Sequence, residues 1–177
     1  MGKTFFKQTV RDVNVERQTV LVRVDYNVPL KDDGTIDDDL RIRASLPTIK
    51  YLLENQCKLV LISHMGRPEG RDESLSLAPT AARLSELLGQ SVRFIDDCVG
   101  DKVRQMVRQT PCGSIVMLEN LRYYPEEEAN DMSFAKSLVK STGAAFFVQD
   151  GFGAAHRAHA STDAVTMCLP SFADLLL

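Results

Sequence analysis

Five basic side chains stand at positions that suit the binding of an anion, although the chain is acidic overall. His64, Arg67, Arg122 and Arg157 each come after a short apolar run, and Arg41 opens a helical pattern. Clustered guanidinium groups repel one another and gain little unless an anion lies among them. Each charge-assisted hydrogen bond to a phosphate or carboxylate contributes about 1.5–3 kcal/mol. The set therefore predicts a pocket for a small, multiply anionic metabolite.

Two polar residues that follow the first apolar run fit the same pocket. The Asp25 carboxylate accepts hydrogen bonds, and the Asn27 amide both donates and accepts them, so together they suit a ligand hydroxyl group. An alternative interpretation is that each arginine is a surface residue with its own local ion-pair partner. The sequence leaves that alternative open for any single arginine. Four arginines, however, share the same topological position, which favours a common anion-binding role for the set.

Other kinds of chemistry find less support. The sequence has no G-x-x-x-x-G-K-[ST] phosphate loop, no G-x-S-x-G elbow and no cysteine beside a histidine. Residues 151–156 begin like a dinucleotide fingerprint but place His156 where the third glycine belongs. His156 and His159 lack a third ligand of cysteine or glutamate type, and the aspartates of residues 32–39 lack calcium-loop spacing. We therefore expect no metal site.

The elements that must position these side chains alternate along the chain. Five short apolar runs are typical of strands, and the second, fourth and fifth are nearly free of charge, as in a parallel sheet covered on both faces. The runs are residues 19–24, 59–63, 91–95, 114–118 and 144–148.

Helix-period segments lie between these strands. They are residues 39–55, 78–88, 99–109 and 131–141. Pro47 falls inside the first segment and should kink it or start a second helix. The alternation predicts one α/β domain over residues 1–177, a Rossmann-like three-layer α/β/α domain with a parallel sheet, whose ligand binds beyond the carboxyl ends of the strands. We expect the acidic run 126–128 to form a solvated face.

Composition excludes several further classes of protein. The 177 residues are 44% hydrophobic and 25% charged, with a net charge of −3, which argues against disorder and against a nucleic-acid or anionic-membrane partner. No apolar stretch is long enough for a membrane span, and the N-terminus lacks a secretory signal. The four cysteines form no C-x-x-C pair, which favours a reduced, cytoplasmic protein.

Taken in order, six stretches of the sequence make up a specific pattern. They are residues 22–30 (VRVDYNVPL), 40–49 (LRIRASLPTI), 63–68 (SHMGRP), 97–100 (DCVG), 118–124 (LENLRYY) and 151–161 (GFGAAHRAHAS). In this order and spacing the chain resembles the N-terminal domain of phosphoglycerate kinases along nearly its whole length. Two departures from that family are mild packing changes, Tyr26 where it usually has Phe and Met65 where it has Leu. Two others change a loop: Gln149 in place of Asn alters side-chain reach near a turn, and Gly151 in place of Ala loosens the backbone.

The resemblance implies an activity and a set of site residues. The activity is reversible, glycolytic phosphoryl transfer between 1,3-bisphosphoglycerate and ADP, giving 3-phosphoglycerate and Mg-ATP. The implied substrate-binding residues are Asp25, Tyr26, Asn27, Arg41, His64, Met65, Gly66, Arg67, Arg122 and Arg157. Arg41 is the implied catalytic residue, since in the family it stabilises the phosphoryl group during transfer.

The resemblance also implies a second domain. The family's nucleotide-binding C-terminal domain, which holds Mg-ATP or ADP, has no counterpart in this sequence, so we expect the chain to be a truncated, inactive half that binds no nucleotide. The intact enzyme is expected to be a cytoplasmic monomer. The alternative is a stand-alone, non-catalytic module that binds an anionic metabolite.

Overall fold

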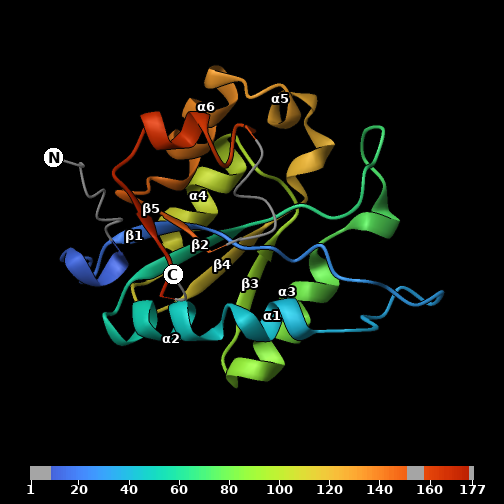
Figure 1. Cartoon of the computed structure of the whole chain (residues 1–177), viewed down its shortest axis with the longest axis horizontal. Helices are drawn as coiled ribbons and strands as arrows, with labels where there is room; N and C mark the ends of the chain where they lie inside the picture. Colours follow the sequence, from blue (N-terminus) through green and yellow to red (C-terminus); the bar gives the residue numbers. More distant parts are fainter. Residues whose placement is uncertain (1–8, 151–157, 176–177) are drawn as a thin grey trace, which may run out of the picture.

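A six-stranded parallel sheet forms the middle of the molecule (Figure 1). The computed structural model describes residues 9–150 and 158–175 of the chain. The order of the strands across the sheet is β3-β4-β2-β1-β5-β6. Their bounds are β1 Thr19–Arg23, β2 Lys58–Ile62, β3 Val92–Ile95, β4 Ile115–Leu118, β5 Phe146–Gln149 and β6 Ser171–Ala173.

The sheet reverses its winding direction at β1. Leu21 of β1 pairs with Val60 of β2 on one side and with Phe147 of β5 on the other. From β1 the chain first builds outward through β2 to the edge strand β3, and it later crosses to the opposite side to add β5 and β6. Such a switch point leaves a crevice at the carboxyl ends of the strands, where ligands of open α/β sheets bind.

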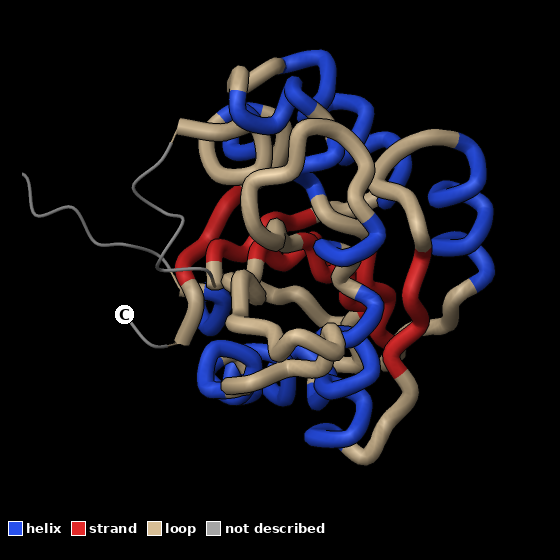
Figure 2. The backbone as a smooth tube through the Cα atoms, turned by 90° about the vertical axis from the view of Figure 1, so that its right-hand side faces the viewer, coloured by secondary structure: helices blue, strands red, loops and turns tan. Residues whose placement is uncertain are grey.

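Helices cover both faces of the sheet, as Figures 1 and 2 show. The first layer contains α1 (Leu40–Ala44), α2 (Leu46–Glu54) and α3 (Ala78–Leu88), and the second contains α4 (Asp101–Gln109), α5 (Pro125–Glu128) and α6 (Met132–Thr142). Successive strand side chains point to opposite faces. The buried side chains accordingly divide into two clusters, one toward α2 and α3 and one toward α4 and α6. The predicted three-layer α/β/α architecture is confirmed.

Local signals in the sequence set the helix boundaries. Pro47 lies in the first turn of α2, so the predicted segment 39–55 divides into α1 and α2. Gly89 and Gly143 follow α3 and α6 with φ of 62° at each, a left-handed conformation that glycine adopts at little cost. The Asp131 side chain caps α6 by accepting from the Phe134 N–H at 2.7 Å. These boundaries confirm the predicted helices to within a few residues.

Some short elements were not predicted. The strand β6 has three residues and pairs with β5, and α5 has four, so neither is long enough to show a periodic pattern. Short 3-10 helices also occur at Val10–Asp12, Glu73–Leu75, Leu121–Tyr123 and Ala164–Met167. Among the described residues, no helix has the length and apolar character needed to cross a membrane.

We predict that Leu61→Ala in β2 lowers the free energy of unfolding by about 2–5 kcal/mol, because truncating a fully buried leucine leaves a cavity. The control is Leu40→Ala, whose leucine is 68% exposed and should change stability by no more than about 0.5 kcal/mol. Urea denaturation followed by circular dichroism measures both. Equal losses in the two variants would contradict the described core.

Candidate functional site

Three segments meet just beyond the carboxyl end of β1. The Asp25 carboxylate forms an ion pair with Arg41 of α1, whose side chain is half exposed. The Asn27 Oδ1 atom accepts a hydrogen bond of 2.9 Å from the Gly66 N–H in the turn after β2. Asp25 and Asn27 therefore connect α1 to the turn after β2, which also carries His64 and Arg67.

Tyr26 lies between these two residues, but its side chain is fully buried in the core. Its phenol oxygen lies 2.7 Å from Ser45 Oγ, and its N–H donates to Ser63 Oγ at 2.9 Å. Burial raises the pKa of Tyr26, so the phenol stays neutral and hydrogen-bonded to Ser45. A tyrosine is thus accommodated where a phenylalanine was the expected family residue, and only its backbone reaches the edge of the sheet.

The turn after β2 is held in one conformation by its neighbours. Met65 is 2% exposed, and its N–H and C=O both bond to the Asn120 amide, at 3.0 and 2.8 Å. Gly66 has φ of 60°, and a Cβ atom there would lie 2.9 Å from Leu75 Cδ1. Any larger residue at Gly66 would be strained and would displace Leu75. Arg67 follows this fixed turn with an exposed side chain.

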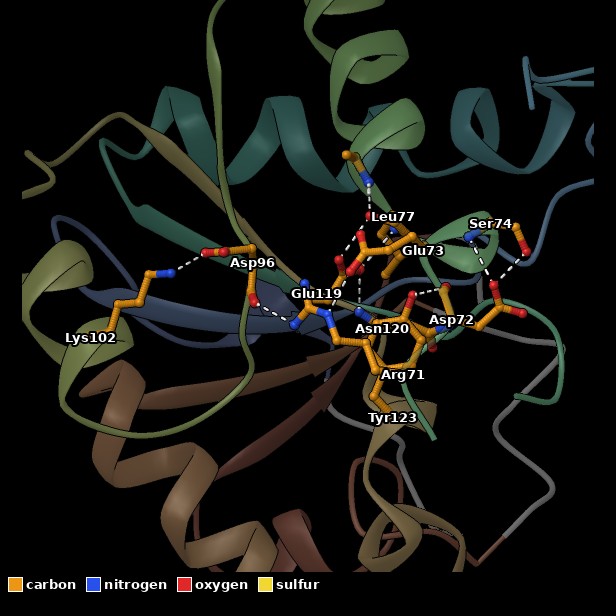
Figure 3. A network of polar contacts seen from close by, with 12 residues as sticks. Arg71, Asp72, Glu73, Ser74, Leu77, Asp96, Lys102, Glu119, Asn120 and Tyr123 are labelled. Carbon is orange, nitrogen blue, oxygen red and sulfur yellow. Dashed lines mark hydrogen bonds and ion pairs between the residues drawn. The ribbon is translucent and has the colours of Figure 1, made fainter. Parts of the chain in front are cut away.

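Glu119 and Asn120, after β4, form a buried polar centre that Figure 3 shows from close by. The Glu119 carboxylate is 2% exposed and accepts from the Leu77 N–H at 2.9 Å, the Ser76 hydroxyl at 2.8 Å and the Asn120 N–H at 2.8 Å. Asn120 also donates to the carbonyl of Leu75 at 2.9 Å. The end of β4 thereby fixes the segment that leads into α3, as well as the turn after β2.

Arg23, the last residue of β1, was missed by the sequence analysis. Its side chain is fully buried, and all three guanidinium nitrogens have partners: Nε donates to Ser161 Oγ at 2.9 Å, Nη1 to the Val24 carbonyl at 2.5 Å and Nη2 to His64 Nδ1 at 2.9 Å. Desolvation lowers the pKa of Arg23, and the nearby carboxylates of Glu127 and Asp25 oppose that effect. The signal that could have revealed it is an arginine within an otherwise apolar central strand.

The expectation of a solvated acidic face at residues 126–128 was wrong for Glu127. Its side chain is fully buried, with Oε2 accepting from the Ser161 N–H at 2.9 Å and Oε1 from the Ser161 hydroxyl at 2.5 Å. Glu128 forms an ion pair of 2.6 Å with Arg122, whose side chain is 3% exposed. Two members of the acidic run therefore lie close to buried cations, and the partner of Glu127 lies 34 residues along the chain, too far for charge patterning to reveal it.

Asp150, at the end of β5, faces a second carboxylate. Its N–H donates to the Arg23 carbonyl at 2.9 Å, and its Oδ1 accepts from the Thr48 hydroxyl at 2.7 Å. Burial raises the pKa of Asp150 to about 8, the Thr48 hydrogen bond opposes this, and the nearby Asp174 carboxyl adds to it. Burial and the neighbouring Asp174 carboxyl therefore both favour the protonated form of Asp150.

Several of the predicted site residues thus lie together at the carboxyl edge. The structure joins Asp25 to Arg41 and Asn27 to Gly66, and Asn120 holds both Met65 and the Arg122 N–H. Arg67 is exposed on the same turn, while Arg157 lies outside the described residues. Within residues 9–150 and 158–175, no group of three or more His, Cys, Asp or Glu side chains could hold a metal ion.

The fold and the site define an open, doubly wound α/β domain whose cationic and polar side chains gather at the carboxyl edge of its parallel sheet. The family model for phosphoglycerate kinase matches residues 10–177 of the chain. The chain belongs to the phosphoglycerate kinase family.

Individual relatives agree with this assignment. The phosphoglycerate kinase of Thermomicrobium roseum is 54% identical over 171 residues, a match that covers 96% of this chain and 43% of the relative. That of Dictyoglomus turgidum is 51% identical over 168 residues, covering 95% and 42%. The crystal structure of phosphoglycerate kinase from Pyrococcus horikoshii superimposes with a TM-score of 0.87 at 35% identity, covering 96% of this chain and 42% of that one. The chain therefore spans about two fifths of the length of these relatives.

The carboxyl group of Asp150 makes stability depend on pH. The folded state keeps this proton up to about pH 8, whereas an unfolded aspartate loses it near pH 4, so Asp150 destabilises the fold progressively as the pH rises between those values. We predict that Asp150→Asn, which preserves the shape, gains stability relative to the wild type, and gains more at pH 8 than at pH 5. Asp37→Asn, at an exposed position, is the control and should leave the pH profile unchanged. Urea titrations at both pH values measure the effect, and parallel profiles for Asp150→Asn and the wild type would contradict it.

Proposed function

We propose that this chain is the phosphoglycerate-binding part of a cytoplasmic phosphoglycerate kinase, which transfers a phosphoryl group between 1,3-bisphosphoglycerate and ADP to give 3-phosphoglycerate and ATP. The observation that carries the proposal is the convergence of family motifs around the end of β1, where Asp25 meets Arg41 and Asn27 meets the turn of His64 and Arg67. This convergence lies at the switch point of the sheet, which favours ligand binding.

Each residue has a proposed role in holding the substrate. Asp25 and Asn27 position the end of the substrate that carries its hydroxyl and carboxyl groups. The backbone of Tyr26, Met65 and Gly66 shapes the floor, since these residues are buried or tightly packed. For the 3-phosphate we propose a group of basic residues formed by His64, Arg67, Arg122 and Arg157.

Arg41 is the proposed catalytic residue. The substrate's own carboxylate attacks the γ-phosphoryl group of ATP, so the chain needs no nucleophile of its own, and catalysis consists of positioning and charge neutralisation. The Arg41 side chain is 52% exposed while its guanidinium is held by Asp25, so it is oriented and still accessible from solvent. That combination suits a cation that must meet a phosphoryl group arriving from a separate nucleotide site.

The nucleotide site belongs, in this proposal, to residues outside this chain. The relatives are more than twice as long as the matched region, and the sequence contains neither a G-x-x-x-x-G-K-[ST] loop nor a complete G-x-G-x-x-G fingerprint. The chain by itself would bind phosphoglycerate but neither Mg-ATP nor ADP, and would transfer nothing. No nucleic-acid or membrane partner is proposed, and the intact enzyme would act as a monomer.

We predict that 3-phosphoglycerate, added to the 15N-labelled chain at low salt, shifts the backbone amide resonances of Asn27, Arg41 and Gly66. Mg-ATP at the same concentration should leave them in place. Inorganic phosphate is the control for simple anion binding, and it should cause smaller shifts that do not extend to Asn27. Shifts that are absent with 3-phosphoglycerate, or equal with all three ligands, would contradict a phosphoglycerate site.

A second prediction concerns Arg41 in the full-length enzyme that carries this chain. Arg41→Ala should lower kcat by about 100-fold or more and change KM much less, because the lost interaction acts in the transition state. Arg43→Ala is a matched control on the same helix: the two side chains are 52% and 50% exposed, but Arg43 pairs with Asp39. Steady-state kinetics of both variants test the role. An unchanged kcat for Arg41→Ala, or an equal loss in Arg43→Ala, would exclude it.

A further inference from the structure

A continuous series of hydrogen bonds runs from the buried Glu127 to His64 at the edge of the sheet. Glu127 accepts from both the N–H and the hydroxyl of Ser161, at 2.9 and 2.5 Å. The Ser161 oxygen accepts from Arg23 Nε at 2.9 Å, and Arg23 Nη2 lies 2.9 Å from His64 Nδ1. Glu127, Ser161 and Arg23 are each fully buried, whereas His64 is partly exposed. The series thus connects the interior to one predicted ligand-binding side chain.

The chemistry of a guanidinium group decides the direction of the last bond. Every guanidinium nitrogen is a donor and none can accept, so His64 Nδ1 must offer its lone pair to Arg23. A histidine ring with an accepting Nδ1 carries its single proton on Nε2. We propose that Arg23 is a positioning residue that keeps His64 in the neutral tautomer with the proton on Nε2.

The remaining bonds in the series prevent Arg23 from turning away. The Ser161 hydroxyl gives its proton to Glu127, so the lone pairs of its oxygen are left to accept from Arg23 Nε. The Val24 carbonyl receives Nη1 at 2.5 Å. Because all three nitrogens are fixed in a buried site, the guanidinium plane and the direction of Nη2 are determined. Ser161 and Glu127 therefore act on His64 through Arg23.

The consequence for ligand binding rests on the proposed function. A neutral His64 would meet the anionic substrate as a single oriented N–H donor at Nε2, and the positive charge of the site would come from its arginines. An Nδ1–H ring would instead present a lone pair at Nε2, which repels a phosphate or carboxylate oxygen. The apparent Kd for 3-phosphoglycerate should therefore rise in inverse proportion to the fraction of His64 that remains in the Nε2–H form.

The test is 15N NMR of the imidazole rings in the ligand-free chain at neutral pH, with His64 assigned by loss of its signals in His64→Gln. The two ring nitrogens of His64 should be widely separated, with the nonprotonated resonance assigned to Nδ1 and the protonated one to Nε2. A ring protonated on Nδ1, or on both nitrogens, would overturn the proposal without the need for any variant.

Two substitutions test the positioning role. Ser161→Ala removes the acceptor for Arg23 Nε, and it should bring the two His64 nitrogen resonances toward each other as the tautomers mix. Ser141→Ala is the matched control, since Ser141 is also buried and its hydroxyl accepts one hydrogen bond, from the Gly100 N–H at 2.8 Å, outside this series. It should leave the His64 signals unchanged. If Ser161→Ala fails to fold, Glu127→Gln, which keeps the shape but removes the charge opposite Arg23, takes its place.

Titration of the same proteins with 3-phosphoglycerate separates this inference from the proposed function. A wild-type ring in the Nε2–H form without any binding would refute the proposed function and leave the tautomer assignment intact. A Kd that rises in Ser161→Ala together with the mixing of tautomers supports the positioning role. A Kd that rises while the His64 spectrum stays unchanged overturns it.

Discussion

The burial of a positive charge at the end of the central strand is the constraint on which the functional edge of this domain depends. Arg23 terminates β1 and is fully enclosed, and removing a guanidinium from water is tolerable only when its donors find partners and its charge is balanced. Those partners are Val24 directly after β1, His64 after β2 and Ser161 near the end of the chain, with Glu127 of α5 behind Ser161. Satisfying one side chain thus holds four separate segments together.

Two buried carboxylates fix the loops at the same edge of the sheet by accepting hydrogen bonds. Glu127 and Glu119 are both almost completely enclosed, and they accept hydrogen bonds from backbone N–H groups and serine hydroxyls. Such hydrogen bonds tie a carboxylate to fixed points of the backbone. Glu119 secures the approach to α3, and Glu127 secures Ser161. The loops at the carboxyl edge are therefore ordered by polar contacts, whereas the helices and strands are ordered by apolar packing.

This division explains which parts of the molecule the sequence could predict. Apolar periodicity revealed the first five strands and the segments of α1 to α4 and α6, and Pro47, Gly89 and Gly143 marked helix boundaries, because these signals act over a few neighbouring residues. β6 and α5 were too short to show a period. Arg23 and Glu127 were missed because their roles come from contacts more than thirty residues away in the chain. The convergence of Asp25, Asn27, Arg41 and the His64 turn could be anticipated, since strand order alone brings loops to one edge.

The cations at this edge fall into two groups that differ in what they can do. Arg23 and Arg122 are buried and held by partners within the domain, so their charges are fixed in place before any ligand arrives. Arg41 and Arg67 are exposed, so they can change position at little cost when an anion or a second domain approaches. Preorganised charges lower the reorganisation needed in the transition state, whereas exposed ones can follow a group as it moves. The proposed phosphoryl transfer requires both properties: the fixed charges depend on buried Glu127 and exposed Glu128 of α5, and Arg41 depends on the position of α1 at the edge of the sheet.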